Sequence, residues 1–228
     1  MGNYLIIGAS SGIGKAIAEQ LSEHHQVFGT YHQNMVSSDR IQYSSYNACS
    51  DQFSTDWLPA HLDGLVFCPG KISLQPFNRI KPEQFIQDYE LQVLGAIKTI
   101  QACLPLLKQA EQANILLFST VAVQTGMSFH SLVASSKGAI EGLSRALAAE
   151  LAPKISINCI APSLTDTPLA NGLINTEQKR EAAEQRHPLK RIGHVDDIAG
   201  MACHILTQGG RFMTGQIITI DGGLSAIR

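Results

Sequence analysis

The sequence predicts an α/β protein in which helices cover both faces of a doubly wound, mostly parallel sheet. Short apolar segments alternate along the chain with longer amphipathic segments of helical periodicity. Strands that alternate with helices form βαβ units, whose right-handed crossovers place helices on both faces of a parallel sheet. The 228 residues, of which 44% are hydrophobic, suffice for one core, and no repeat or Pro/Gly-rich linker divides them. We therefore expect a single domain over residues 1–228.

Six strands and four long helices are expected. The strands are expected at residues 4–7, 26–30, 64–67, 114–118, 156–160 and 216–220, and the helices at residues 12–24, 82–108, 135–151 and 195–206. The segment 161–194 carries no strand signal and contains a polar, helix-like stretch at 175–185. Because ligands of open α/β sheets bind beyond the carboxyl ends of the strands, this segment is a candidate substrate lid. The alternative is a plain surface excursion.

Composition argues against several kinds of partner and site. The formal net charge is −2 and no basic stripe is present, so nucleic acid is not an expected partner. The apolar run at residues 4–7 is too short for a signal sequence or a membrane span, so we expect a cytoplasmic protein with no membrane contact. The five cysteines are odd in number and contain no C-x-x-C pair, so neither a disulfide framework nor a metal site is expected.

A glycine-rich turn follows the first expected strand and leads directly into the first expected helix. Its residues are Gly8, Ala9, Ser10, Ser11, Gly12, Ile13 and Gly14. Glycines permit a tight turn and close approach of the backbone to a ligand, while a helix N-terminus presents free N–H groups to a pyrophosphate. In this strand–turn–helix setting the pattern predicts a Rossmann-type dinucleotide site that uses all of these residues except Ala9. A turn without a ligand is the alternative.

This turn is similar to the glycine motif of the short-chain dehydrogenases/reductases, and the resemblance extends over nearly the whole chain. Residues 63–70 resemble the family's strand that ends in Asn-Asn-Ala-Gly, and residues 135–138 resemble its active-site helix. Residues 158–162 and 214–223 resemble the segment beside the nicotinamide and the C-terminal strand and turn. The resemblance implies a nicotinamide-dependent oxidoreductase that acts on a small molecule and forms a homodimer or homotetramer.

The catalytic residues that the resemblance implies are only partly present. The family uses a Tyr as acid/base, a Lys four residues later that binds the ribose and lowers the pKa of the Tyr, a Ser that holds the substrate, and an Asn that relays protons. Lys137 matches the Lys, but Val133 stands at the Tyr position and cannot transfer a proton. Thr120 replaces the Ser and keeps a hydroxyl, and Gln92 replaces the Asn and keeps an amide. An ordinary solvated lysine is the alternative for Lys137.

A histidine near the catalytic helix is a candidate replacement for the missing Tyr. His130 precedes Lys137 by seven positions, the same offset as the Tyr in the enoyl reductase branch of the family. An imidazole is a competent acid/base near neutral pH. Alternatively, His130 only packs in a loop beside Met127 and Phe129.

The end of the second strand bears on the choice between NAD and NADP. An acidic residue there would bind the adenosine ribose and repel a 2′-phosphate, but the chain has Tyr31 and His32, which favours NADP(H). Asn47 stands where the family often places an Asp against adenine. The remaining expected cofactor residues are Cys68, Gly70, Lys137, Pro162, Ser163, Thr165 and Thr167. For Cys68, a buried small hydrophobe is favoured over a reactive thiol.

Three functions are compatible with these residues. The favoured one is an NADPH-dependent reductase of a carbonyl or an activated alkene, because the changes at Thr120 and Gln92 are chemically conservative. A catalytically silent sensor or scaffold that binds dinucleotide is the main alternative, and a lyase or isomerase is a third. The sequence does not indicate which substrate is bound.

Overall fold

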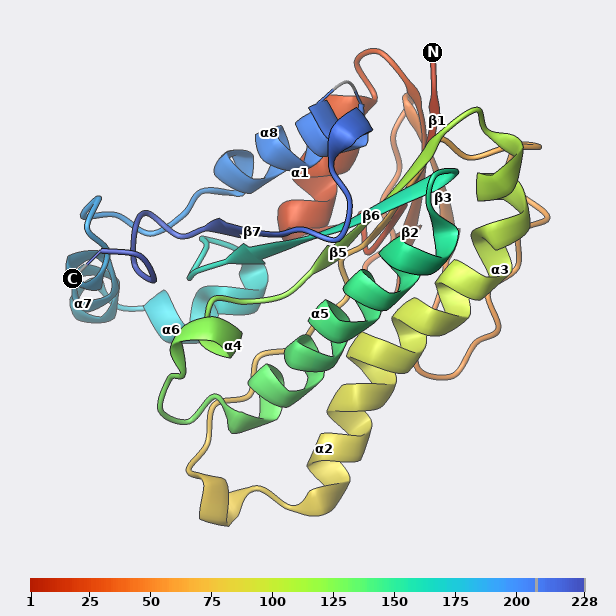
Figure 1. Cartoon of the computed structure of the whole chain (residues 1–228). Helices are drawn as coiled ribbons and strands as arrows, with labels where there is room; N and C mark the ends of the chain where they lie inside the picture. The colour runs from red at the N-terminus through yellow and green to blue at the C-terminus, as the bar shows by residue number, and fades with distance from the viewer. Residues whose placement is uncertain (208, 228) are drawn as a thin grey trace.

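A computed structural model describes residues 1–207 and 209–227, and its centre is a seven-stranded parallel sheet. The strand order is β3-β2-β1-β4-β5-β6-β7 (Figure 1). The chain proceeds from β1 to β3 at one edge, crosses back to β4 beside β1, and continues to β7 at the other edge. The strands are β1 (Asn3–Ile7), β2 (Gln26–Tyr31), β3 (Ile41–Ser45), β4 (Gly64–Phe67), β5 (Ala113–Phe118), β6 (Ile155–Pro162) and β7 (Ile217–Ile220). This order is that of a doubly wound Rossmann fold, which confirms the predicted fold class.

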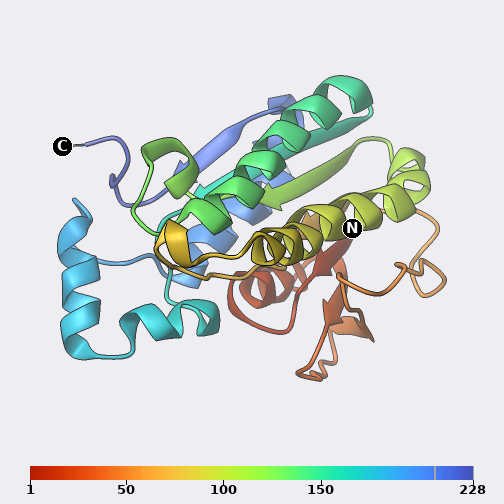
Figure 2. The ribbon, with the colours of Figure 1, turned by 90° about the horizontal axis from the view of Figure 1, so that it is seen from below.

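Helices cover both faces of the sheet. The α-helices are α1 (Gly12–Leu21), α2 (Pro82–Tyr89), α3 (Gly95–Gln109), α4 (Ala122–Thr125), α5 (Ser131–Leu151), α6 (Asn171–Ile174), α7 (Glu177–Arg186) and α8 (Val195–Leu206). Helices α1 and α8 pack on one face, while α2, α3 and α5 lie on the other (Figures 1 and 2). Short 3-10 turns occur at η1 (Phe77–Arg79), η3 (Pro168–Ala170) and η4 (Gly209–Phe212), and η2 (Glu90–Leu94) is a π-helical turn.

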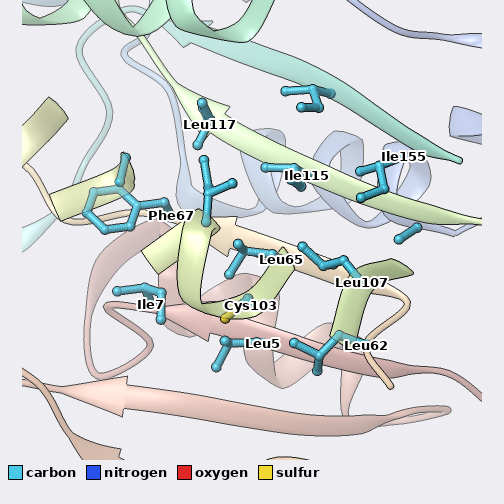
Figure 3. Packing of buried hydrophobic residues seen from close by; sticks show 14 of the residues in the cluster. Leu5, Ile7, Leu62, Leu65, Phe67, Cys103, Leu107, Ile115, Leu117 and Ile155 are labelled. Carbon is cyan, nitrogen blue, oxygen red and sulfur yellow. The ribbon is translucent and has the colours of Figure 1, made fainter. Parts of the chain in front are cut away.

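Alternate residues of the central strands face two separate cores. In β1, Leu5 and Ile7 join the core beneath α3 and α5, whereas Tyr4 and Ile6 join the core beneath α1 and α8. This follows from the two-residue period of a strand, and it explains why every residue of β1 is buried. Figure 3 shows the first core, in which Cys103 of α3 packs among leucine and isoleucine side chains.

The structure differs from the expected elements at β3, in the division of one helix, at the start of α5 and in the short helices α4 and α6, which were not expected. Strand β3 was not expected, because its sequence is mostly polar and it forms an edge of the sheet that pairs only with β2. The expected single helix over 82–108 is divided into α2, η2 and α3 by the π-helical turn. The catalytic helix α5 begins at Ser131, four residues before the expected start at Ser135. The expected boundaries of the other helices and strands are correct to within three residues.

The carboxyl ends of the strands point toward the segment that follows β6. That segment contains η3, α6 and α7, which project from one end of the molecule (Figure 2). The glycine turn after β1 lies at the same edge of the sheet as the turn after β4, because β1 and β4 are paired and parallel. The parallel sheet therefore places loops from distant parts of the sequence around one site.

Candidate active site

The glycine turn between β1 and α1 is shaped to accept an anionic group. Gly8 and Gly12 have φ values of +81° and +54°, which lie in the left-handed region that residues with a side chain rarely adopt. The Gly8 N–H donates to Thr30 Oγ1 at 3.0 Å and the Ala9 N–H donates to the Thr30 carbonyl at 2.8 Å, so β2 holds the turn in place. The N-cap Ser11 makes no side-chain capping bond, which leaves the first N–H groups of α1 available to a ligand.

Gly14 is required by close packing inside the turn. A Cβ atom at this position would lie 2.3 Å from the Gly8 carbonyl oxygen and 3.2 Å from the Cys68 sulfur. The first contact is with backbone, so it could not be relieved by moving a side chain. Burial raises the pKa of Cys68 to about 12, so its thiol stays protonated near neutral pH. Cys68 is half-buried and lines the cavity, and its protonated thiol supports the interpretation of a small packing side chain over that of a reactive thiol.

A cavity of about 700 Å³ runs along this edge of the sheet and brings together most of the expected cofactor residues. Those lining it are Gly8, Ser10, Ser11, Gly12, Ile13, Gly14, Tyr31, His32, Asn47, Cys68, Gly70 and Thr167. A Cβ atom on Gly12 would lie 3.4 Å from Thr167 Cγ2, so the glycine turn and the expected lid segment meet across the cavity. A volume of this size is in the range of known ligand pockets.

One end of the cavity is formed by the loops after β2 and β3. Tyr31, His32 and Gln33 line it, and none of the three is acidic. Asn47 also lines this end, but its side-chain carbonyl already accepts the Cys49 N–H at 3.0 Å. Its amide NH₂ group is free to donate to a ligand, and its carbonyl oxygen can accept one further hydrogen bond.

At the other end, Gln92 and Lys137 converge beside Gly70. A Cβ atom on Gly70 would lie 3.4 Å from Gln92 Oε1 and 3.7 Å from Lys137 Nζ. Gln92 is 1% exposed, and its Oε1 atom has no hydrogen-bond partner among the described residues. Burial lowers the pKa of Lys137, while nearby Cys159, Asp88 and Cys68 act in the opposite direction. The two side chains therefore place an unpaired carbonyl oxygen and an ammonium group beside Gly70, which lines the cavity, although neither Gln92 nor Lys137 is itself a lining residue.

Thr120 and Val133 occupy the two other family positions. Thr120 follows β5, and its Oγ1 accepts the Ala122 N–H at 3.4 Å, which leaves the hydroxyl hydrogen free to be donated. Val133 lies in the first turn of α5 and is only 6% exposed. The Tyr position of the family is therefore a packed aliphatic position in this chain.

His130 immediately precedes α5 and is not among the residues that line the cavity. Its Nδ1 lies 2.8 Å from the Ser128 carbonyl oxygen. A carbonyl oxygen can only accept, so Nδ1 carries the hydrogen of this bond. Nε2 of His130 is therefore available for acid/base chemistry. The bond to Ser128 holds the ring in the loop before α5, and His130 does not line the cavity.

The segment after β6 places its expected cofactor residues in different surroundings. Thr167 lines the large cavity, whereas Thr165 is buried and its hydroxyl donates to the Ser163 carbonyl at 3.1 Å. Ser163 Oγ lies 2.9 Å from Nε2 of the buried His187 and lines a separate cavity of about 160 Å³. Pro162 ends β6, paired with Ile220 of β7.

Two buried acidic residues near the site were not predicted. Asp88 is 3% exposed and its Oδ2 accepts the Gln92 Nε2–H at 2.6 Å. Glu141 of α5 is 5% exposed and accepts the Ser119 hydroxyl at 2.7 Å. The spacing of Asp88 and Gln92, four positions apart in a helical segment, was the available signal for the first of these contacts.

Comparison with known proteins agrees with this geometry. A family profile described as Enoyl-(Acyl carrier protein) reductase matches residues 27–225. The chain belongs to the short-chain dehydrogenase/reductase family. Within this family it is 27% identical over 242 residues to a tropinone reductase homolog of Arabidopsis thaliana, covering 98% of this chain and 92% of that protein. It is 26% identical to L-xylulose reductase of Bos taurus, covering 97% and 96% of the two chains.

Solved structures of the family show the same fold. The NADP complex of RhlG from Pseudomonas aeruginosa superposes with a TM-score of 0.91 at 27% identity, covering 98% of this chain and 96% of that one. A short-chain dehydrogenase family protein from Francisella tularensis superposes with a TM-score of 0.90, also at 27% identity, covering 99% of each chain. The protein is accordingly an NAD(P)-dependent oxidoreductase of this family.

The described residues contain neither a membrane-spanning helix nor a metal-binding cluster. Among residues 1–207 and 209–227, no helix has both the length and the apolar character needed to cross a membrane. The same part of the chain contains no group of three or more His, Cys, Asp or Glu side chains placed to hold a metal ion.

Proposed function

We propose that this short-chain dehydrogenase/reductase is an NADPH-dependent reductase of a carbonyl or an activated alkene. The observation that carries the proposal is the meeting of Lys137 and Gln92 at the Gly70 edge of the cavity. The other end of the same cavity is formed by the glycine turn together with the loops after β2 and β3. The N-terminus of α1 at the glycine turn suits a pyrophosphate. A dinucleotide that lies between these two ends would place its reactive ring near Lys137.

The residues present fit this cofactor. The N–H groups at the start of α1 would bind the pyrophosphate, and Lys137 would donate to the nicotinamide ribose. Tyr31 and His32 would receive the adenosine ribose, and the lack of an acidic side chain among the lining residues there favours a 2′-phosphate. When bound, the cofactor supplies a hydride to the substrate.

The side chains of the protein would then hold the substrate and move its proton. The Thr120 hydroxyl is free to donate to a substrate carbonyl oxygen and so to stabilise the negative charge that develops there. Lys137 and His130 each carry a group that can deliver the proton. The segment 161–194, which reaches the glycine turn at Thr167, is proposed as the substrate lid.

An assembly of two or four copies in the cytoplasm is part of this proposal. Ile86, Tyr89 and Leu94 of the α2–η2 segment are 59%, 41% and 41% exposed, and apolar side chains gathered on one helical segment favour contact with a second copy. Light scattering on the purified protein tests this assembly. A monomer at micromolar concentration would contradict it.

The first experiment is a fluorescence titration with NADPH and NADH, followed by NADPH oxidation with a panel of ketones and enoyl thioesters. Wild type, His130→Ala and Lys137→Ala are compared. We expect NADPH to bind more tightly than NADH and at least one substrate to be reduced. Loss of turnover in His130→Ala with unchanged NADPH affinity would assign the proton donor to His130.

The packed Val133 at the Tyr position favours the second candidate, a silent dinucleotide-binding sensor or scaffold. Tight NADPH binding without turnover of any substrate would support it. Absence of binding by either dinucleotide would contradict both proposals.

A further inference from the structure

A buried carboxylate lies behind the Lys137 end of the cavity. Asp88 is 3% exposed, at a position in α2 whose two neighbours in sequence are exposed. Its Oδ1 atom has no hydrogen-bond partner among the described residues, and its Oδ2 atom is bonded to Gln92. Burial of a carboxylate lowers the stability of the fold unless a nearby positive charge compensates it. We therefore expect a basic side chain close to Asp88.

Lys137 is the basic side chain that Asp88 affects, because a carboxylate at Asp88 favours the ammonium form of Lys137. Three side chains act on the charge of Lys137: Cys68 of the β4 end, Cys159 of β6 and Asp88 of α2. Burial raises the pKa of both cysteines to about 12, so the thiols are neutral under ordinary conditions. Asp88 is thus the single carboxylate among the three groups that act on the ammonium.

Gln92 lies beside both Asp88 and Lys137. Its Nε2–H donates to Asp88 at 2.6 Å, and its unpaired Oε1 points toward the Gly70 edge, where Lys137 Nζ also lies. A carboxylate that accepts from one end of an amide makes the oxygen at its other end a better acceptor, because hydrogen bonds in a chain polarise one another. Gln92 sits in the π-helical turn η2, a local distortion that often occurs at functional sites.

We propose that Asp88 is a positioning residue which, through Gln92, keeps the Lys137 ammonium charged and aimed at the cavity, so that Lys137 takes the place of the missing phenol as proton donor. This inference rests on the proposed reductase function and deepens it. With a ketone substrate, the carbonyl carbon accepts the hydride that NADPH supplies, and the π electron pair moves to oxygen. The oxygen forms its O–H bond with a proton from Lys137 Nζ, which becomes a neutral amine. The ketone is reduced to an alcohol as NADPH is oxidised to NADP⁺, and Lys137, which is partly exposed, regains a proton from water.

The first test follows the titration of Lys137 itself. Protein labelled with [ε-¹³C]lysine is titrated by NMR, and the Lys137 signal is assigned by its loss in Lys137→Arg. Asp88→Asn removes the charge and keeps an acceptor for Gln92, so we expect the pKa of Lys137 to fall by about one pH unit. Glu90→Gln, an exposed carboxylate two residues away, is the matched control and should leave it unchanged. An unchanged Lys137 titration in Asp88→Asn would overturn the proposal.

The second test is the pH dependence of kcat with NADPH and a substrate ketone. Asp88→Asn should move the alkaline limb to lower pH by the same amount, which gives about a tenfold loss of kcat on that limb. Asp88→Glu keeps the charge and should recover most of this loss. A lower melting temperature in Asp88→Asn with an unchanged pH profile would show that Asp88 is merely structural.

A failure of this inference can be distinguished from a failure of the proposed reductase function. The NMR titration needs no substrate, so it reports on Asp88 and Lys137 even if wild type reduces nothing. If Asp88→Asn does not fold, the NMR titration of Lys137 is done with Asp88→Ser, because the serine hydroxyl can still accept the hydrogen bond from Gln92. Turnover in wild type together with an unshifted Lys137 titration would refute the inference alone.

Discussion

The glycine-turn end and the Lys137 end of the cavity are built from the same fold but differ in what holds them. The glycine turn is fixed by backbone: left-handed φ values at Gly8 and Gly12, hydrogen bonds to Thr30, and a contact distance at Gly14 that excludes any side chain. The Lys137 end is fixed by side chains that meet from different elements. Backbone geometry depends on glycine, whereas a side-chain cluster can exchange one polar group for another. This difference explains how one end of the site follows the family pattern while the other end lacks its Tyr.

The largest effect is expected at the glycine turn. Gly14→Val should weaken NADPH binding by about 100-fold, because overpacking costs of up to about 3 kcal/mol correspond to that factor. Fluorescence titration measures the binding. Gly200→Ala is the control, since a Cβ atom there meets nothing within 4 Å in helix α8, and it should bind NADPH as wild type does. Equal affinity of Gly14→Val and wild type would mean that the cofactor does not occupy this turn.

The next effect is at Lys137. Lys137→Met should lower kcat by about 100-fold or more, the usual contribution of a general acid. Oxidation of NADPH with a substrate ketone measures this loss, and a kcat equal to that of wild type would contradict a role of Lys137 as proton donor.

Burial of Lys137 gives the stability of the wild-type fold a pH dependence of definite sign. The pKa of Lys137 is lowered in the folded protein, so the unfolded chain binds more protons between the folded and unfolded pKa values. Wild-type stability therefore rises with pH across this interval, whereas Lys137→Met, which lacks the amine, should not show this rise. Melting curves at several pH values measure the difference, and a constant difference up to pH 10 would contradict it.

A smaller effect is expected from restoring the family Tyr. Val133→Tyr should lower the free energy of unfolding by about 1–3 kcal/mol without raising kcat, because the position is packed and only 6% exposed. Val133→Phe adds the same ring without the hydroxyl and separates packing from chemistry. An increase of kcat in Val133→Tyr but not in Val133→Phe would show that the Lys137 end can still use the family Tyr. The Lys137 end would then differ less from the glycine-turn end than we infer.

The smallest effect is expected at the start of α8, far from the chemistry. Asp197 accepts the His194 N–H at 2.7 Å and pairs with Arg191, which together lower its pKa to about 2. Asp197→Asn should cost about 1 kcal/mol at pH 7, since it removes the partly exposed ion pair with Arg191 while the amide oxygen can still accept the His194 N–H. A carboxylate with a lowered pKa stabilises the fold above pH 4, and its contribution is lost as the pH falls toward 2. Urea unfolding at pH 7 and pH 2.5 should therefore show the difference at the higher pH, with Asp196→Asn as the exposed neighbouring control.

The sequence by itself determined the order of strands and helices, the glycine turn and the absence of a Tyr at position 133. These features depend on local periodicity and on residue types at fixed spacing, which can be identified within a short window. The residues after β1 and β2 that line the cavity were accessible to the same reasoning, because parallel strands bring their carboxyl ends to one edge.

Only the tertiary structure decided the rest. Strand β3 is mostly polar and forms by pairing with β2, so its own sequence carries a weak signal. The π-helical turn and the cluster of Asp88, Gln92 and Lys137 arise where α2 and η2 pack against α5. Lys137 follows Gln92 by 45 positions in sequence, and burial of a charge depends on all the elements around it. Local patterns do not contain that information.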